Sequence, residues 1–221
     1  MSDRALILDF GGVISRTLFE THPMSETALG LAPGTLTWRG PFDPEGDALW
    51  RAMQAGEISE RAYWQTRTGE VGALVGQDWS EMRQFVQAAR GADPGDVIRP
   101  EFLTTLQIAR QAGVKLAILS NELDLFYGAG FRDKLPFLDE FTTIQDATYT
   151  GILKPDPRAY TACLDALSLP ANACVFVDDQ ARNIAGARVV GLQTVEFDVA
   201  RPAQSYNRAL GLLNIHERCL P

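Results

Sequence analysis

From about residue 98 onward, short apolar runs alternate with segments of helical periodicity. Helices are predicted at 100–112, 157–167, 181–190 and 202–213, and strands at 114–119, 141–144, 174–177 and 192–195. One more strand-like run, 5–9, lies near the start of the chain. Strands separated by helices of this length form parallel sheets with helices on both faces. The sequence therefore predicts an α/β fold.

Residues 16–96 have a different character. They contain no strand-like run, and all four tryptophans fall there: Trp38, Trp50, Trp64 and Trp79. Two helices are predicted to meet at Gly56, with Ser59 as the N-cap of the second. Residues 91–100 are rich in glycine and proline and are predicted to link back to the sheet. We therefore predict a catalytic core of 1–15 plus 97–221, and a helical domain, 16–96, inserted after the first strand around an aromatic core.

Composition excludes several classes of partner. The net charge of −8 and the absence of a basic run argue against nucleic acid. No apolar run approaches the roughly 20 residues that a membrane helix needs. The first residues carry no secretory signature, and the cysteines, Cys163, Cys174 and Cys219, are odd in number and lack metal-type spacing. These features predict a cytoplasmic protein with reduced thiols.

Polar side chains follow several predicted strands. Asp9 ends the first; the others are followed by Ser120 and Asn121, by Lys154, and by Asp178 and Asp179. In an open parallel sheet, functional groups gather beyond the carboxyl ends of the strands. Neighbouring carboxylates repel each other unless a hard divalent cation, most simply Mg²⁺, lies among them. A hydroxyl, a backbone N–H and an ammonium group suit a phosphate. The set predicts phosphoryl transfer.

Four segments in series, "LILDFGGVI", "LAILSNE", "GILKPDP" and "VFVDDQARN", resemble the haloacid dehalogenase (HAD) superfamily of hydrolases. The helical insertion is similar to the cap of subfamily I. The resemblance implies a Rossmann-like core and an aspartyl-phosphate formed on Asp9. It also implies that Ser120 holds the phosphoryl oxygens and that Lys154 neutralises charge. Mg²⁺ would be held by Asp9, the Gly11 carbonyl, Asp178 and Asp179.

Other residues are candidates for supporting roles. Gly12, like Asn121, is a candidate to bind the substrate through its backbone, since glycine lets the chain approach a ligand closely. Asn183, one helical turn beyond Asp179, is expected to orient the carboxylates or Lys154. Arg39, in the loop "TWRGPFDPEG", is either a contact for a substrate anion or a surface arginine. Neither His22 nor His216 follows a core strand, so neither is assigned to catalysis.

Gly11 is where the family's phosphatases usually carry a second aspartate, the general acid–base. Three functions therefore stay open. The first is a Mg²⁺-dependent phosphatase of a small phosphomonoester, a sugar phosphate being one candidate. The second is a metal-independent 2-haloacid dehalogenase, whose leaving halide needs no proton. The third is a binding protein without turnover. Asp178 and Asp179 favour the phosphatase, because without a cation they would repel Asp9. An apolar cap face could pack on the core or on a second subunit, so a homodimer also stays open.

Overall fold

The computed structural model describes residues 3–89, 94–121, 123–127 and 130–215. It divides into two compact units. The core unit comprises Met1–Arg16, Ile98–Asp124 and Leu135–Pro221, and the helical unit comprises Thr17–Val97 and Leu125–Lys134. The predictions for His216 and Cys219 lie outside the described residues.

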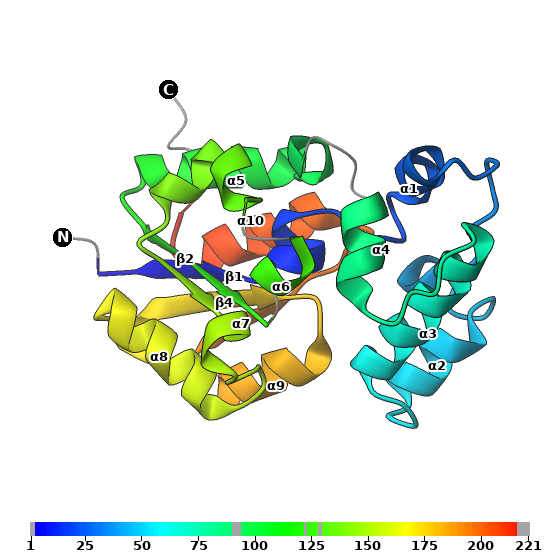
Figure 1. The fold of residues 1–221 in the computed structure, drawn as a ribbon. Coiled ribbons are helices and arrows are strands. Elements are labelled where there is room, and N and C mark those ends of the chain that lie inside the picture. Colours follow the sequence, from blue (N-terminus) through cyan, green and yellow to red (C-terminus); the bar gives the residue numbers. More distant parts are fainter. Residues whose placement is uncertain (1–2, 90–93, 122, 128–129, 216–221) are drawn as a thin grey trace. The chain divides into compact units, whose positions relative to one another are not determined.

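The core unit is built on a five-stranded parallel sheet with strand order β3-β2-β1-β4-β5. Its strands are β1 (Ala5–Leu8), β2 (Lys115–Ser120), β3 (Thr143–Asp146), β4 (Cys174–Asp178) and β5 (Gln193–Glu196). Its helices are α5 (Pro100–Gln111), α7 (Ala147–Thr150), α8 (Pro157–Leu167), α9 (Ala181–Val189) and α10 (Pro202–Leu212). Helices α5 and α10 cover one face of the sheet, and α8 and α9 cover the other (Figure 1). The predicted α/β fold is confirmed.

Apolar side chains that alternate between the two faces of the sheet form the core of this unit. Ala5 and Ile7 of β1 point to the same face as Phe176 of β4, and they pack with Tyr160 and Leu167 of α8. These side chains are almost wholly excluded from water. A central parallel strand is covered on both faces, which explains why the sequence of β1 is a continuous apolar run.

One predicted strand is displaced. The sequence predicts a strand at 141–144, whereas β3 begins at Thr143 and ends at Asp146. The Phe141 ring stacks on the Phe102 ring of α5, with centroids 6.4 Å apart. The aromatic residue that suggested a strand therefore packs against a helix before the strand begins. The boundary matters, because Asp146 now stands at the carboxyl end of β3.

The helical unit contains α1 (His22–Leu29), α2 (Ala48–Gln54), α3 (Glu60–Leu74) and α4 (Met82–Ala89). No strand occurs among the described residues of 17–97. The side chain of Ser59 accepts a hydrogen bond from the Ala62 amide and caps α3, as predicted. Trp38 is buried, and the other three tryptophans pack partly buried around the same cluster, which confirms the aromatic core.

The helical unit also includes a segment that the sequence analysis placed in the core. Helix α6 (Leu123–Tyr127) begins in the core unit, but from Leu125 the chain belongs to the helical unit, and it returns to the core at Leu135. Phe126 and Tyr127 pack against the tryptophan cluster, which gives the physical reason. None of the described helices is both long and apolar enough to cross a membrane.

Candidate active site

The register of the sheet brings the predicted strand ends together. Leu8 of β1 pairs with Ile118 of β2 on one side and with Val177 of β4 on the other. Asp9, the next residue, donates its backbone N–H to the Val177 carbonyl at 2.9 Å. The side chains that follow β1, β2 and β4 therefore leave the sheet at the same edge.

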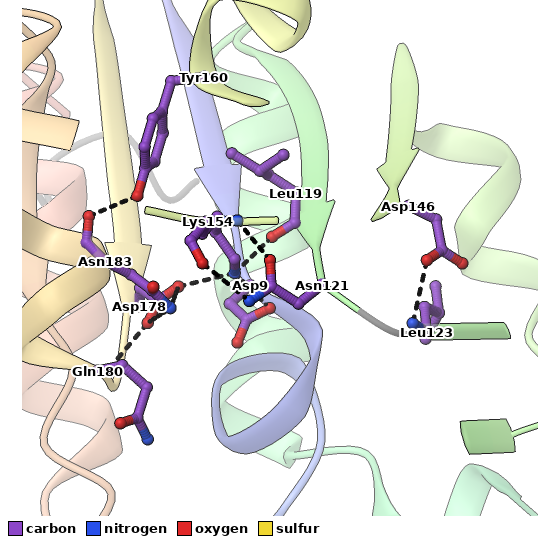
Figure 2. Close-up of polar contacts among 10 residues, drawn as sticks. All are labelled: Asp9, Leu119, Asn121, Leu123, Asp146, Lys154, Tyr160, Asp178, Gln180 and Asn183. Atoms are coloured by element: carbon purple, nitrogen blue, oxygen red, sulfur yellow. Dashed lines mark hydrogen bonds and ion pairs between the residues drawn. The ribbon is translucent and has the colours of Figure 1, made fainter. Parts of the chain in front are cut away.

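Lys154 lies at the centre of this edge (Figure 2). Its Nζ lies 2.8 Å from Asp9 Oδ1, 2.8 Å from Asp178 Oδ2 and 2.7 Å from the Leu119 carbonyl oxygen. Only 1% of the side chain is exposed. Burial by itself would lower the pKa of Lys154, but the carboxylates of Asp178 and Asp9 outweigh it and raise the pKa. The ammonium is therefore fixed in its charged form.

Asp9 keeps more access to solvent, with 14% of its side chain exposed. Burial, reinforced by the nearby Asp178 carboxylate, raises the pKa of Asp9 to about 6, although Lys154 opposes the shift. A carboxylate at the end of a strand, beside a fixed ammonium and reachable from outside, has the properties of a nucleophile.

Asp178 is fully buried and surrounded by donors. Besides Lys154, the Asn183 amide nitrogen lies 3.0 and 3.1 Å from its two oxygens, and the Gln180 N–H donates at 2.8 Å. Asn183 thus contacts the carboxylate that it was predicted to orient. The Tyr160 hydroxyl in turn donates to the Asn183 carbonyl at 2.7 Å. These contacts leave Asp178 little freedom to rotate.

Asn121 has a different set of contacts from the one expected of a substrate ligand. Its Oδ1 accepts the Lys154 N–H at 2.7 Å, and its Nδ2 donates to the Lys154 carbonyl at 3.3 Å. The side-chain amide therefore holds the main chain at Lys154, as Figure 2 shows. A role for the Asn121 backbone in substrate binding stays a prediction.

The other predicted residues are distributed as follows. Ser120 is the last residue of β2 and is 7% exposed. Gly11 and Gly12 lie in a π-helical turn, Phe10–Ile14, that follows Asp9. Gly12 has φ of 78°, a conformation that favours glycine, whereas Gly11 has φ of −70°. Arg39 is exposed in the helical unit, and its role in substrate binding stays a prediction.

Three carboxylates could hold a metal ion. One oxygen each from Asp9, Asp178 and Asp179 lies within 4.8 Å of the others. Hard oxygen donors at this separation suit Mg²⁺, which binds a few carboxylates and keeps several of its waters. Lys154 Nζ pairs with two of these carboxylates, Asp9 and Asp178. The donor set therefore fits a divalent cation, which would also offset the repulsion among the carboxylates.

Sequence reasoning missed Asp146. It is 5% exposed, and its carboxylate accepts the N–H groups of Leu123, Asp124 and Thr148 at 3.2, 2.9 and 2.9 Å. It thus fixes the start of α6, directly after Ser120 and Asn121. The same signal, a polar residue after a buried strand, would have identified it had the β3 boundary been placed correctly.

A sequence model of the haloacid dehalogenase-like hydrolase family matches residues 4–191, most of the chain. The chain belongs to this family. Phosphatase MT3486 of Mycobacterium tuberculosis is 31% identical over 99 residues, which cover 45% of this chain and 46% of that protein. (S)-2-haloacid dehalogenase 1 of a Pseudomonas species is 32% identical over 112 residues, 50% of this chain and 48% of that protein. The chain thus matches less than half of either relative.

Solved structures show the same fold. A HAD family enzyme of Bacteroides thetaiotaomicron, crystallised with magnesium and inorganic phosphate, superposes with a TM-score of 0.52 at 17% identity. The match covers 90% of this chain and 95% of that protein. The family identifies this HAD chain as a hydrolase. Phosphatases and dehalogenases both occur among its relatives.

Proposed function

We propose that this HAD chain is a Mg²⁺-dependent phosphatase that hydrolyses a small phosphomonoester, a sugar phosphate being one candidate. The observation that carries the proposal is the closeness of three carboxylates: one oxygen each of Asp9, Asp178 and Asp179 lies within 4.8 Å of the others. Carboxylates this close repel one another, and a divalent cation among them offsets that repulsion. A dehalogenase that works without metal has no need of the third carboxylate.

In the proposed reaction, a carboxylate oxygen of Asp9 attacks phosphorus, and the bond from phosphorus to the ester oxygen breaks. The alkoxide takes a proton from water, because Gly11 offers none. Water then attacks the aspartyl-phosphate and releases inorganic phosphate, which restores Asp9. Lys154 and Ser120 stabilise negative charge on the phosphoryl oxygens. Mg²⁺ held by Asp9, Asp178, Asp179 and the Gly11 carbonyl would supply further charge neutralisation.

The second candidate is a 2-haloacid dehalogenase. Gly11 favours it, since halide leaves without a proton and the missing acid then costs nothing. The curated dehalogenase relative supports the same alternative. The cytoplasmic location, the small phosphorylated substrate, the lack of a nucleic-acid or membrane partner, and the homodimer stay predictions.

A paired assay separates the candidates. We would measure phosphate release from p-nitrophenyl phosphate and halide release from 2-chloropropionate, each with Mg²⁺ and with EDTA. We expect phosphate release that is lost on chelation and restored by added Mg²⁺. Halide release that is indifferent to EDTA would establish the dehalogenase instead. Silence in both assays would favour either a substrate outside these two probes or the third alternative, a binding protein without turnover.

A further inference from the structure

Three consecutive carbonyls of the turn that follows Asp9 accept hydrogen bonds from distant parts of the core unit. The Gly12 carbonyl accepts from Arg99 Nε at 3.0 Å, and the Val13 carbonyl accepts from the Tyr206 hydroxyl at 2.6 Å. The Ile14 carbonyl accepts from the Arg99 backbone N–H, also at 3.0 Å. The turn is therefore held from outside along its whole second half.

The two side-chain donors are buried and share one aromatic neighbour. Arg99 is 3% exposed and Tyr206 is 1% exposed. The Arg99 guanidinium carbon lies 5.5 Å from the centre of the Phe197 ring, and the same ring packs edge-to-face on Tyr206 at 5.0 Å. We call Arg99, Phe197 and Tyr206 the clamp. A guanidinium packed on an aromatic face and bonded to a carbonyl is restricted in direction, so the clamp is rigid.

The turn needs external support because its own backbone is permissive. Gly11 and Gly12 interrupt the helical conformation of Phe10–Ile14, and glycine has the widest choice of backbone angles. This turn also connects the nucleophile to the proposed metal ligand at the Gly11 carbonyl. A small rotation of it would move both oxygen donors, and groups that orient metal ligands typically change metal affinity or activity by about 10- to 100-fold when removed.

We propose that Arg99 and Tyr206 are positioning residues, which set the geometry of Asp9 and of the Gly11 carbonyl through the turn. The inference rests on the proposed phosphatase function and deepens it. It assigns a role to Tyr206 of α10. The side-chain hydrogen bonds of both residues to the turn end on main-chain carbonyls, so the proposed effect passes through the main chain of the turn.

Tyr206→Phe is the sharpest test, because it removes one hydroxyl and keeps the ring on Phe197. Thr105→Val is the matched control: Thr105 is 3% exposed in the same unit, and its hydroxyl donates to the Glu101 carbonyl at 2.8 Å, within α5. Both variants lose one buried hydroxyl. Only the first releases the turn. Arg99→Lys, which keeps the charge but loses the flat guanidinium, serves as a second variant.

We would measure Mg²⁺ binding by calorimetry without substrate, hydrogen exchange of the amides of residues 10–15, and kcat and KM. For Tyr206→Phe we expect the Kd for Mg²⁺ to rise about 10-fold and kcat to fall about 10-fold. Amide exchange in the turn should be faster, and KM should change little. Thr105→Val should match the wild type in all four quantities.

The outcomes separate this inference from the proposed function. A wild-type protein that binds no Mg²⁺ contradicts the phosphatase proposal. If the wild type binds Mg²⁺ and Tyr206→Phe binds it equally well, with kcat no lower than in Thr105→Val, the clamp is merely structural and the inference is overturned. An Arg99→Lys protein that shares the losses of Tyr206→Phe supports it.

Discussion

Two carboxylates, Asp9 in the core unit and Asp47 in the helical unit, each face a basic side chain but differ in the number of donors that they share with other groups. Asp47 accepts from Arg67 Nη2 at 2.6 Å, the Tyr63 hydroxyl at 2.9 Å and the Trp50 N–H at 2.8 Å. Asp9 shares the single ammonium of Lys154 with Asp178.

The pKa shifts record this difference. Burial alone would raise the pKa of Asp47, but the hydrogen bonds from Trp50 and Tyr63 and the charge of Arg67 bring it below its usual value. Burial raises the pKa of Asp9 to about 6, and Lys154 does not reverse the shift. Asp47 accepts from three side-chain and main-chain donors, which hold its charge, whereas Asp9, the proposed nucleophile, keeps a perturbed pKa of the kind found at functional sites.

The largest expected effect comes from replacing the carboxylate of the core unit. Asp9→Asn removes the nucleophile, so we expect turnover to fall by at least about 10³-fold. The free energy of unfolding should stay level or rise, because a desolvated carboxylate is removed while Lys154 keeps Asp178 and the Leu119 carbonyl. Steady-state phosphate release and urea denaturation measure the two quantities. Substantial turnover in this variant would exclude the covalent mechanism.

Asp47→Asn should lower the free energy of unfolding and leave the nucleophile in place. It leaves Arg67 without its fully buried partner, and breaking a buried pair costs about 3 kcal/mol of unfolding free energy. Glu70 also pairs with Arg67, at 2.7 Å, and can keep the cost at the low end. Urea denaturation followed by tryptophan fluorescence reports on this unit, since all four tryptophans lie in it. If Asp47→Asn and Asp9→Asn changed the free energy of unfolding by the same amount, the contrast between the two carboxylates would be contradicted.

His22 gives the stability of the helical unit a dependence on pH. It is 5% exposed, and neither ring nitrogen has a hydrogen-bond partner in the part of the chain that the structure describes. Burial lowers its pKa from 6.5 to about 4. The unfolded chain therefore binds a proton at His22 between these values while the folded chain does not, so stability falls as pH falls below 6.5.

The full loss at His22 is about 3 kcal/mol, reached near pH 4. Because carboxylates also titrate in this range, the measurement is a difference: unfolding free energy against pH for the wild type and for His22→Phe, whose ring can pack on Trp38 and Phe19 as the imidazole does. Parallel curves for the two proteins would show that His22 takes up its proton in the folded state as well.

Much of the site could be predicted from the sequence, because strand ends carry a local signal. Asp9, Ser120 and Asp178 each follow or end a buried apolar run. The register of the parallel strands then brings these residues to the same edge of the sheet. The supporting contacts had no such signal. Arg99 and Tyr206 reach the turn across 87 and 193 residues of sequence. No periodicity marks such pairs, since they depend on how α5 and α10 pack over the sheet.

The role of Asn121 was missed for a related reason. The sequence shows a polar residue after a strand but not the direction of its amide, which is engaged with the main chain at Lys154. Short helices were also hard to delimit: α1, α6 and α7 have few turns in which periodicity can develop. Tertiary contacts decide these elements, as the packing of Phe126 and Tyr127 on the tryptophan cluster illustrates.

The smallest expected effect concerns Gly11, where a substitution adds an acid beside Asp9 instead of removing one. Gly11 is exposed, its φ of −70° suits any residue, and a Cβ built there meets no atom of the described residues within 4 Å. The turn therefore has room for the acid that the sequence lacks. Positioned general acids contribute about 10²- to 10⁴-fold, and an acid added without supporting contacts should give less, so we expect Gly11→Asp to raise kcat for a poor leaving group by about 10-fold.

A good leaving group such as p-nitrophenolate should gain almost nothing from Gly11→Asp, because it departs without a proton. The ratio of kcat for an alkyl phosphate to kcat for p-nitrophenyl phosphate is therefore the quantity to measure, and it is insensitive to the amount of folded enzyme. Gly12→Asp is the control: its φ of 78° strains any side chain, so it should lose activity on both substrates. An unchanged ratio in Gly11→Asp would show that protonation of the leaving group does not limit this enzyme.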